Sequence, residues 1–208
     1  MLDADALLMQ MRYEERSPPL GSAGRGWRTR SHRRLALPLP SVSDPRMKPA
    51  QHPTAIRVAQ LLRDAGVVTD VVEFEQPTRT SAEAAAAIGC SVAEIAKTIV
   101  FRGGNSGQAI VVVASGDRRV SIAKVEAQLG EPLVRADAEF VRTATGYAIG
   151  GVPPLGHALV TKVLLDEGLR RFDVVWAAGG TPFSVFPIGP DRLPGVTGAP
   201  WASLSEDS

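Results

Sequence analysis

The sequence predicts a single α+β domain with a mixed, mostly antiparallel central sheet flanked by short helices. Segments with strand character are short and are joined mainly by glycine-rich turns, which is typical of hairpins rather than of repeated βαβ units. Segments with helical spacing are also short, and each is bounded by capping or terminating residues. With 208 residues and 44% hydrophobic content, the chain can build one sizeable core.

The first 50 residues differ in composition from the rest of the chain. They carry 9 Lys/Arg against 5 Asp/Glu, whereas residues 51–208 carry 14 against 17. Residues 17–45 are dense in Pro, Gly, Ser and Arg, a composition that buries too little apolar surface to fold. We therefore interpret residues 1–50 as a disordered basic extension and residues 51–208 as the domain, with a native start at Met47 as an alternative. The acidic balance of the domain predicts weak nonspecific binding to nucleic acid.

The domain begins with a predicted helix, a strand and two further helices. Apolar residues recur with helical spacing over residues 54–66, a segment that ends in a glycine. Residues 71–74 then predict a strand. Thr80 and Ser91 are each followed three residues later by Glu, so both match capping boxes and predict two short helices.

A hairpin is predicted next. Residues 98–101 are β-branched or aromatic, and the turn at residues 103–107 can reverse them into a second strand, 109–113. A helix over residues 124–129 is closed by Gly130. A further short helix up to Arg142 is capped by Asp137, and the remaining predicted strands are 119–121, 158–161, 173–178 and 183–188.

Common catalytic signatures are missing from the sequence. It contains no P-loop, no G-x-G-x-x-G after a strand, no G-x-S-x-G elbow and no H-E-x-x-H. A single cysteine and three scattered histidines predict neither a metal site nor a bound cofactor. Cys90 follows a helix-ending glycine and is interpreted as a packing residue rather than a catalytic thiol. For His157, a partly exposed loop histidine is favoured over a site residue.

Two features remain as candidates for a site. Lys97 is expected where the second capped helix passes into a strand, so its ammonium is held in place; taken alone, it is better explained by favourable interaction with the helix dipole. The second feature is the turn Gly150-Gly151-Val152-Pro153-Pro154. Its glycines allow backbone N–H groups to face a ligand, and its prolines stiffen the loop, although a simple tight turn explains it equally.

Three segments, in order, resemble the YbaK/EbsC family, the editing domains associated with prolyl-tRNA synthetase. They are RTSAEAAAAIGC with the following IAKTIVF, then TGYAIGGVPPLG, then AAGG. The similarity extends from about Pro53 to Asp191. Three ordered matches are more specific than any one of them alone.

The resemblance implies a metal-free hydrolase that cleaves the ester between a wrong amino acid and tRNA, usually tRNA for proline. In that family the lysine matched by Lys97 is required for activity, and the loop matched by Gly150 to Pro154 positions the aminoacyl group. The backbone N–H groups of Gly150 and Gly151 would then stabilise the oxyanion. The Lys97 ammonium would pair with a phosphate near the 3′ adenosine.

Further substrate-binding residues follow from the same resemblance. The pocket is expected to draw on the segment from Phe74 to Thr80, with Phe74 near the amino-acid side chain; core packing of Phe74 is an equally weighted alternative. The loop contributes Val152, Pro153 and Pro154. Asp191 matches a family position, and helix capping after Pro190 explains it equally well.

The C-terminal end departs from the family. Relatives usually carry a helix there, whereas this chain has Leu193-Pro194-Gly195 and Gly198-Ala199-Pro200. Proline and glycine at these positions predict an extended arm instead.

Together these observations predict a cytoplasmic, trans-editing aminoacyl-tRNA deacylase acting on tRNA(Pro) that carries Cys, Ala or another small amino acid. The alternative is a non-catalytic tRNA- or synthetase-binding module on the same fold. Expected partners are the acceptor 3′ end of aminoacylated tRNA and prolyl-tRNA synthetase, and neither a membrane nor DNA is expected. Roughly 20 consecutive apolar residues would be needed to cross a bilayer, and no such stretch is present.

Overall fold

The computed structural model describes residues 47–159 and 161–206. Residues 1–46 of the predicted disordered extension lie outside the described residues. Lys48 and Pro49, at the end of that predicted extension, form a short strand paired with residues 72 and 73. Lys48 also forms an ion pair with Glu75, with 2.8 Å between Nζ and Oε1.

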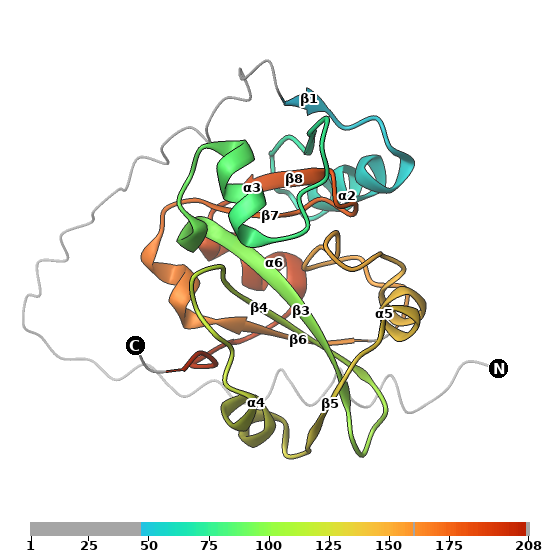
Figure 1. Cartoon of the computed structure of the whole chain (residues 1–208), viewed down its shortest axis with the longest axis vertical. Helices are drawn as coiled ribbons and strands as arrows, with labels where there is room; N and C mark the ends of the chain where they lie inside the picture. The colour runs from blue at the N-terminus through green and yellow to red at the C-terminus, as the bar shows by residue number, and fades with distance from the viewer. Residues whose placement is uncertain (1–46, 160, 207–208) are drawn as a thin grey trace, which may run out of the picture. The chain divides into compact units, whose positions relative to one another are not determined.

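One sheet organises the described residues (Figure 1). Its strand order is β1-β2-β8-β7-β3-β4-β6-β9, with β5 paired to β3. Of the eight strand pairs found among the described residues, five are antiparallel and three are parallel. The predicted mixed, mostly antiparallel sheet is therefore confirmed.

The elements have the following bounds. The strands are β1 Lys48–Pro49, β2 Val72–Glu73, β3 Ile95–Gly103, β4 Ala109–Ser115, β5 Leu133–Arg135, β6 Thr161–Asp166, β7 Val175–Ala178, β8 Ser184–Ile188 and β9 Trp201–Ala202. The α-helices are α2 Pro53–Asp64, α3 Ser81–Ile88, α4 Ile122–Leu129, α5 Ala138–Thr145 and α6 Leu193–Thr197. Three 3-10 turns are η1 Val92–Glu94, η2 Glu167–Arg171 and η3 Pro190–Arg192. None of the helices in the described part of the chain is long and apolar enough to cross a membrane.

The centre of the sheet is covered on both faces. Strand β4 is fully buried, and its side chains alternate between two hydrophobic clusters. Val111 and Val113 pack with residues of α2 and α5, whereas Ile110 and Val112 pack with Val125 of α4. A strand buried on both faces has a continuous apolar sequence, as residues 109–114 do.

Local capping signals explain the first two helices well. The Thr80 hydroxyl accepts from the Glu83 N–H, and the Glu83 carboxylate accepts from the Thr80 N–H, which completes the predicted capping box of α3. Gly89 ends α3 with φ of 84°, a conformation that favours glycine. Gly66 follows α2 in the same left-handed region, as predicted.

The second predicted capping box gives only the single 3-10 turn η1. Strand β3 begins at Ile95, immediately after this turn, and residues 96–102 pair with β4. Pairing of the β-branched residues with a buried strand therefore overrides the local helix signal. As a consequence, Lys97 is the third residue of β3 and does not lie at a helix end.

Two other predicted strands are displaced. The strand expected at 158–161 begins only at Thr161, because the N–H groups of Ala158 and Leu159 donate to the carbonyls of Thr145 and Ala144 at the end of α5. The brief strand expected at 119–121 is reduced to one bridge between Val120 and Ser205.

The C-terminal segment is not an extended arm throughout. Residues 193–197 form α6 despite their proline and glycine, because Pro194 lies in the first turn, where its missing N–H is tolerated. The chain then extends and adds β9 parallel to β6. The buried Asp166 carboxylate accepts from the N–H groups of Gly168, Leu204 and Ser205 at 3.0 to 3.1 Å.

Replacing Asp166 with alanine is expected to lower the free energy of unfolding by about 3 kcal/mol, because three N–H groups lose a charged acceptor in a buried position. Urea unfolding measures this change. The exposed neighbour Glu167, changed to alanine, is the matched control and should cost less than about 0.5 kcal/mol. Equal losses for the two variants would contradict the structural role assigned to Asp166.

Candidate functional site

A cavity opens beside the first half of β3. Its volume is about 540 Å³, including the space open to solvent. Its walls come from the segment before α3, from the first turn of α3, from β3, from the 150–152 turn, and from β7 and β8. They consist of Thr78, Arg79, Thr80, Ser81, Ala84, Ile95, Ala96, Lys97, Thr98, Gly150, Val152, Trp176, Ala177, Ala178, Ser184 and Val185. The cavity thus brings together both features singled out from the sequence.

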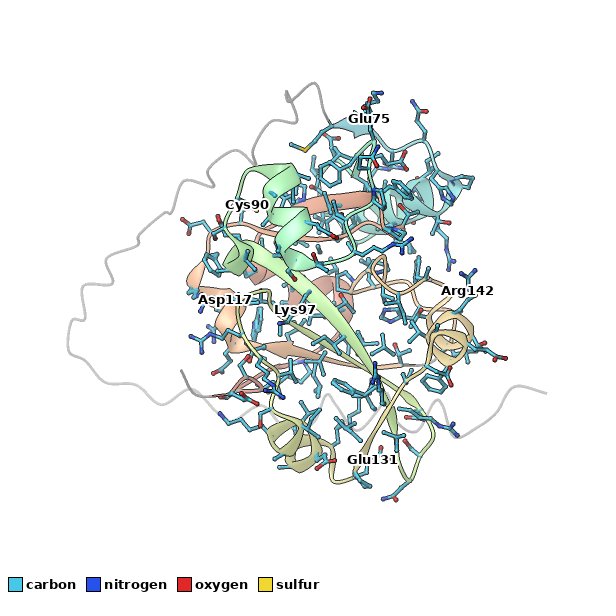
Figure 2. All side chains as sticks on the ribbon, viewed as in Figure 1. Glu75, Cys90, Lys97, Asp117, Glu131 and Arg142 are labelled. Atoms are coloured by element: carbon cyan, nitrogen blue, oxygen red, sulfur yellow. The ribbon has the colours of Figure 1, made fainter. Side chains whose placement is uncertain are left out.

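Lys97 lines this cavity and is held by the turn that follows β4. Its Nζ donates to the carbonyl of Gly116 at 3.3 Å and to the carbonyl of Arg118. Figure 2 shows Lys97 and Asp117 in this part of the molecule. Partial burial lowers the pKa of Lys97, and the nearby carboxylates of Asp117 and Asp166 oppose that shift. An ammonium has three donors, so one remains available for a ligand in the cavity.

In the glycine turn, Gly150 lines the cavity, whereas Gly151 packs against Thr181. The N–H of Gly151 donates to the Ala148 carbonyl at 2.9 Å, which closes a four-residue turn. Gly150 is the third residue of this turn, with φ of 87°, as a type II turn requires. A Cβ on Gly151 would lie 2.5 Å from the carbonyl carbon of Thr181. Gly151 is therefore a packing residue, and its N–H is not available to an oxyanion in this structure.

The two prolines follow the turn, and His157 forms a hydrogen bond with the carbonyl of the first one. Pro153 and Pro154 are buried and do not line the cavity. Nε2 of His157 is 2.9 Å from the Pro153 carbonyl, so it carries the proton, and Nδ1 accepts from the Thr161 hydroxyl at 2.8 Å. Burial lowers the pKa of His157, partly offset by the Pro153 bond. His157 is thus a partly exposed loop histidine, as predicted, and it supports the loop.

The pKa of His157 in the folded protein lies below its ordinary value near 6.5. As pH falls, His157 is therefore protonated at a higher pH in the unfolded chain than in the folded protein. Stability from this group is complete above about pH 6.5 and should decline below it, by at most about 1.4 kcal/mol per pH unit. Chemical unfolding between pH 7.5 and 5 measures the slope. His157→Gln should reduce it, and an unchanged slope would show that other groups cause the pH dependence.

Three hydroxyl residues in the cavity wall, Ser81, Thr98 and Ser184, were not predicted as site residues from the sequence. The Oγ1 of Thr98 is buried and has no hydrogen-bond partner among the described residues. Ser184 is 1% exposed and bonds to Thr181. Thr98 could have been found, since it follows Lys97 within the same family segment. Ser184 carried no local signal, because its place in the cavity depends on β8 lying between β2 and β7.

The other predicted site residues lie at different distances from the cavity. Thr80 and Val152 line it. Phe74 does not line it, and packs in the cluster that contains Ala84 and Trp176 of the cavity wall, as its core-packing alternative predicts. Asp191 is exposed in η3 and lies outside the cavity wall; capping does not explain it either, because Gly189 is the N-cap residue there.

Cys90 also packs against the cluster that contains Phe74. Burial, together with the charge of Glu94, raises the pKa of its thiol to about 11. The thiol therefore stays protonated at neutral pH and is a poor nucleophile. Within the described part of the chain, no group of three or more His, Cys, Asp or Glu residues is arranged to hold a metal ion.

Comparisons with known proteins agree with this geometry. The model of the aminoacyl-tRNA editing domain matches residues 75–194, which include all the cavity walls. The protein YwhH of Bacillus subtilis (strain 168), which is uncharacterized, is 38% identical over 124 residues, covering 60% of this chain and 78% of YwhH.

Solved structures are similar over 76% of the chain. One, described as a "putative trans-editing enzyme for prolyl tRNA synthetase", is 43% identical with a TM-score of 0.70, covering 76% of this chain and 100% of that one. Another, from work on grafting epitope backbones onto scaffold proteins, is 40% identical with a TM-score of 0.71 and the same coverage. The resemblance carried by the three sequence segments is thereby confirmed, and the chain belongs to the aminoacyl-tRNA editing domain family.

Proposed function

We propose that this protein is a trans-editing aminoacyl-tRNA deacylase, a hydrolase that removes a small amino acid such as Cys or Ala from mischarged tRNA(Pro). The observation that supports it most is that Lys97 and Gly150 line one cavity although they come from different parts of the fold. Membership of an editing family and the similarity to a structure described as a prolyl tRNA synthetase trans-editing enzyme support the same reaction.

The chemistry requires little from the protein. An aminoacyl ester is already activated, so hydrolysis needs an oriented water and a donor for the developing oxyanion. The Gly150 N–H makes no hydrogen bond to any described residue, so it is free to donate to that oxygen. The remaining donor of Lys97 would bind a phosphate near the 3′ adenosine, and the terminal ribose hydroxyl of the tRNA would assist the water.

The wall of the cavity favours a small amino acid. Ala84, Ala178 and Val185 present short apolar side chains, and the hydroxyls of Thr98 and Ser184 are among the polar groups of the wall. A synthetase separates side chains that differ by one methylene by only about 1–3 kcal/mol, so a second site that accepts the smaller products improves fidelity. Such a site acts after the synthetase, which makes prolyl-tRNA synthetase the expected partner in the cytoplasm.

The test is hydrolysis of tRNA(Pro) charged in separate reactions with Ala, Cys, Ser, 2-aminobutyrate or Pro. We expect release of at least one small amino acid, and little release of Pro. tRNA(Ala) charged with Ala is the control for tRNA identity. If no substrate is hydrolysed above the Lys97→Ala background while tRNA still binds, the protein is a binding module and not a deacylase.

A further inference from the structure

An ion pair lies outside the cavity wall, next to the turn that holds Lys97. Nη2 of Arg171 donates to both carboxylate oxygens of Asp117, at 2.6 and 2.8 Å. The Arg171 side chain is 33% exposed and that of Asp117 is 43% exposed. Arg171 closes η2, whereas Asp117 lies in the turn after β4, so the pair joins two segments far apart in the sequence.

The turn from Ser115 to Arg118 is held at several points. The Gly116 N–H donates to the Ile95 carbonyl at 2.7 Å, and the Arg118 N–H donates to the Ser115 carbonyl at 3.1 Å. The buried Ser115 hydroxyl accepts from Nη2 of Arg171 at 2.9 Å and lies 2.7 Å from Oδ1 of Asp117. A Cβ on Gly116 would lie 2.2 Å from the Val92 carbonyl oxygen, so the turn is packed directly against η1, which precedes β3.

This turn determines where the Lys97 ammonium lies. The two carbonyls that accept from Nζ belong to Gly116 and Arg118, the residues on either side of Asp117. A lysine side chain has four rotatable bonds, and about 2 kcal/mol of rotamer entropy opposes holding it in one place. If the Asp117 peptide units rotate, the two carbonyls no longer converge on Nζ. The orientation of Asp117 is therefore coupled to the position of Lys97.

We propose that Arg171 is a positioning residue for Lys97, acting through Asp117 and the 115–118 turn and never touching the substrate. The pKa of Asp117 agrees with a carboxylate that is held tightly by its partners. Partial burial by itself would raise the pKa of Asp117, but hydrogen bonds from Ser115 and Arg171 and the charge of Arg171 outweigh it, so the pKa lies below its ordinary value. Asp117 therefore remains ionised at neutral pH, and with Asp166 it favours the charged form of Lys97.

The experiment rests on the proposed deacylase function and compares Arg171→Gln with Arg171→Lys and Asp117→Asn. We expect Arg171→Gln to lower kcat/KM about tenfold, because the cavity wall is intact while the ammonium that would bind the tRNA phosphate is misplaced. Arg171→Lys should recover part of the rate. In a Lys97→Met background, Arg171→Gln should have no further effect, which a general loss of stability would not reproduce. Arg119→Gln, which breaks the exposed pair of Arg119 with Glu206 near the same turn, is the control and should behave like wild type.

A second readout does not depend on activity. NMR of the Lys97 side-chain methylene next to Nζ should show increased mobility of that group in Arg171→Gln. In Asp117→Asn the same signal should report a further fall in the pKa of Lys97, because a favourable negative charge is lost. If wild type is active, Lys97→Met is inactive and Arg171→Gln keeps full activity, the positioning role is wrong and the deacylase proposal stands. If wild type is inactive on every substrate, the deacylase proposal fails, and unchanged mobility and pKa of Lys97 would then overturn the positioning role as well.

Discussion

Replacing Lys97 with methionine is expected to lower the rate of aminoacyl-tRNA hydrolysis about 100-fold or more while the fold is retained. Methionine keeps the length and apolar stem of the side chain but removes the ammonium. The substrate then loses the charged donor that Lys97 offers to it, and removal of one donor from a preorganised site typically costs 10²–10³-fold in rate. Single-turnover deacylation measures the loss under conditions where product release does not limit the rate.

The fold should tolerate this change. Lys97 is only partly buried, so water can replace its bonds to the carbonyls of Gly116 and Arg118. Thermal unfolding of Lys97→Met should therefore stay within a few degrees of wild type. Lys97→Arg separates charge from geometry: the guanidinium retains the charge but cannot reach both carbonyls from the same position. Wild-type activity in Lys97→Met would contradict a catalytic role for this residue.

Gly151→Ala is expected to reduce both stability and activity although Gly151 does not line the cavity. Its Cβ would lie 2.5 and 2.7 Å from backbone atoms of Thr181, and backbone cannot move aside as the end of a flexible side chain can. We expect a loss of about 1–3 kcal/mol in the free energy of unfolding, typical of overpacking. The turn must shift to relieve the contact, so Gly150 moves relative to Lys97 and kcat/KM should fall by at least tenfold.

Gly195→Ala is the matched control for this substitution. Gly195 lies in α6, where a Cβ added to it would meet no atom within 4 Å, and its φ is not positive. Alanine there should leave activity unchanged and stabilise the protein by up to about 1 kcal/mol, since glycine is a poor helix former. Equal behaviour of the two alanine variants would show that the contact between Gly151 and Thr181 does not hold the turn.

Predictions made from short stretches of sequence agree closely with the fold. The capping box at Thr80, the glycine that ends α3 and the hairpin of β3 and β4 all depend on residues near one another in the chain. Ser91 shows the limit of such signals. Its capping box favours a helix, but a long, partly buried strand forms immediately after one turn because pairing with β4 is the stronger interaction.

The candidate site was predicted less completely than the fold. Lys97 and Gly150 share a cavity, as the joint pattern indicated, but the roles of their neighbours differ from expectation. Gly151 uses its N–H inside the turn, and Asp191 lies outside the cavity wall. These differences follow from hydrogen bonds and packing that residue type alone does not specify.

The sequence by itself determined the fold class, the separate composition of the first residues, and the ordered segments that identify the family. Tertiary structure alone decided which groups meet. The carbonyls of Gly116 and Arg118 reach Lys97 because β3 and β4 pair in one register, and Arg171 reaches Asp117 because η2 packs at the end of β4. Both depend on contacts between residues distant in the chain, which are fixed by the order and register of the strands and not by local propensity.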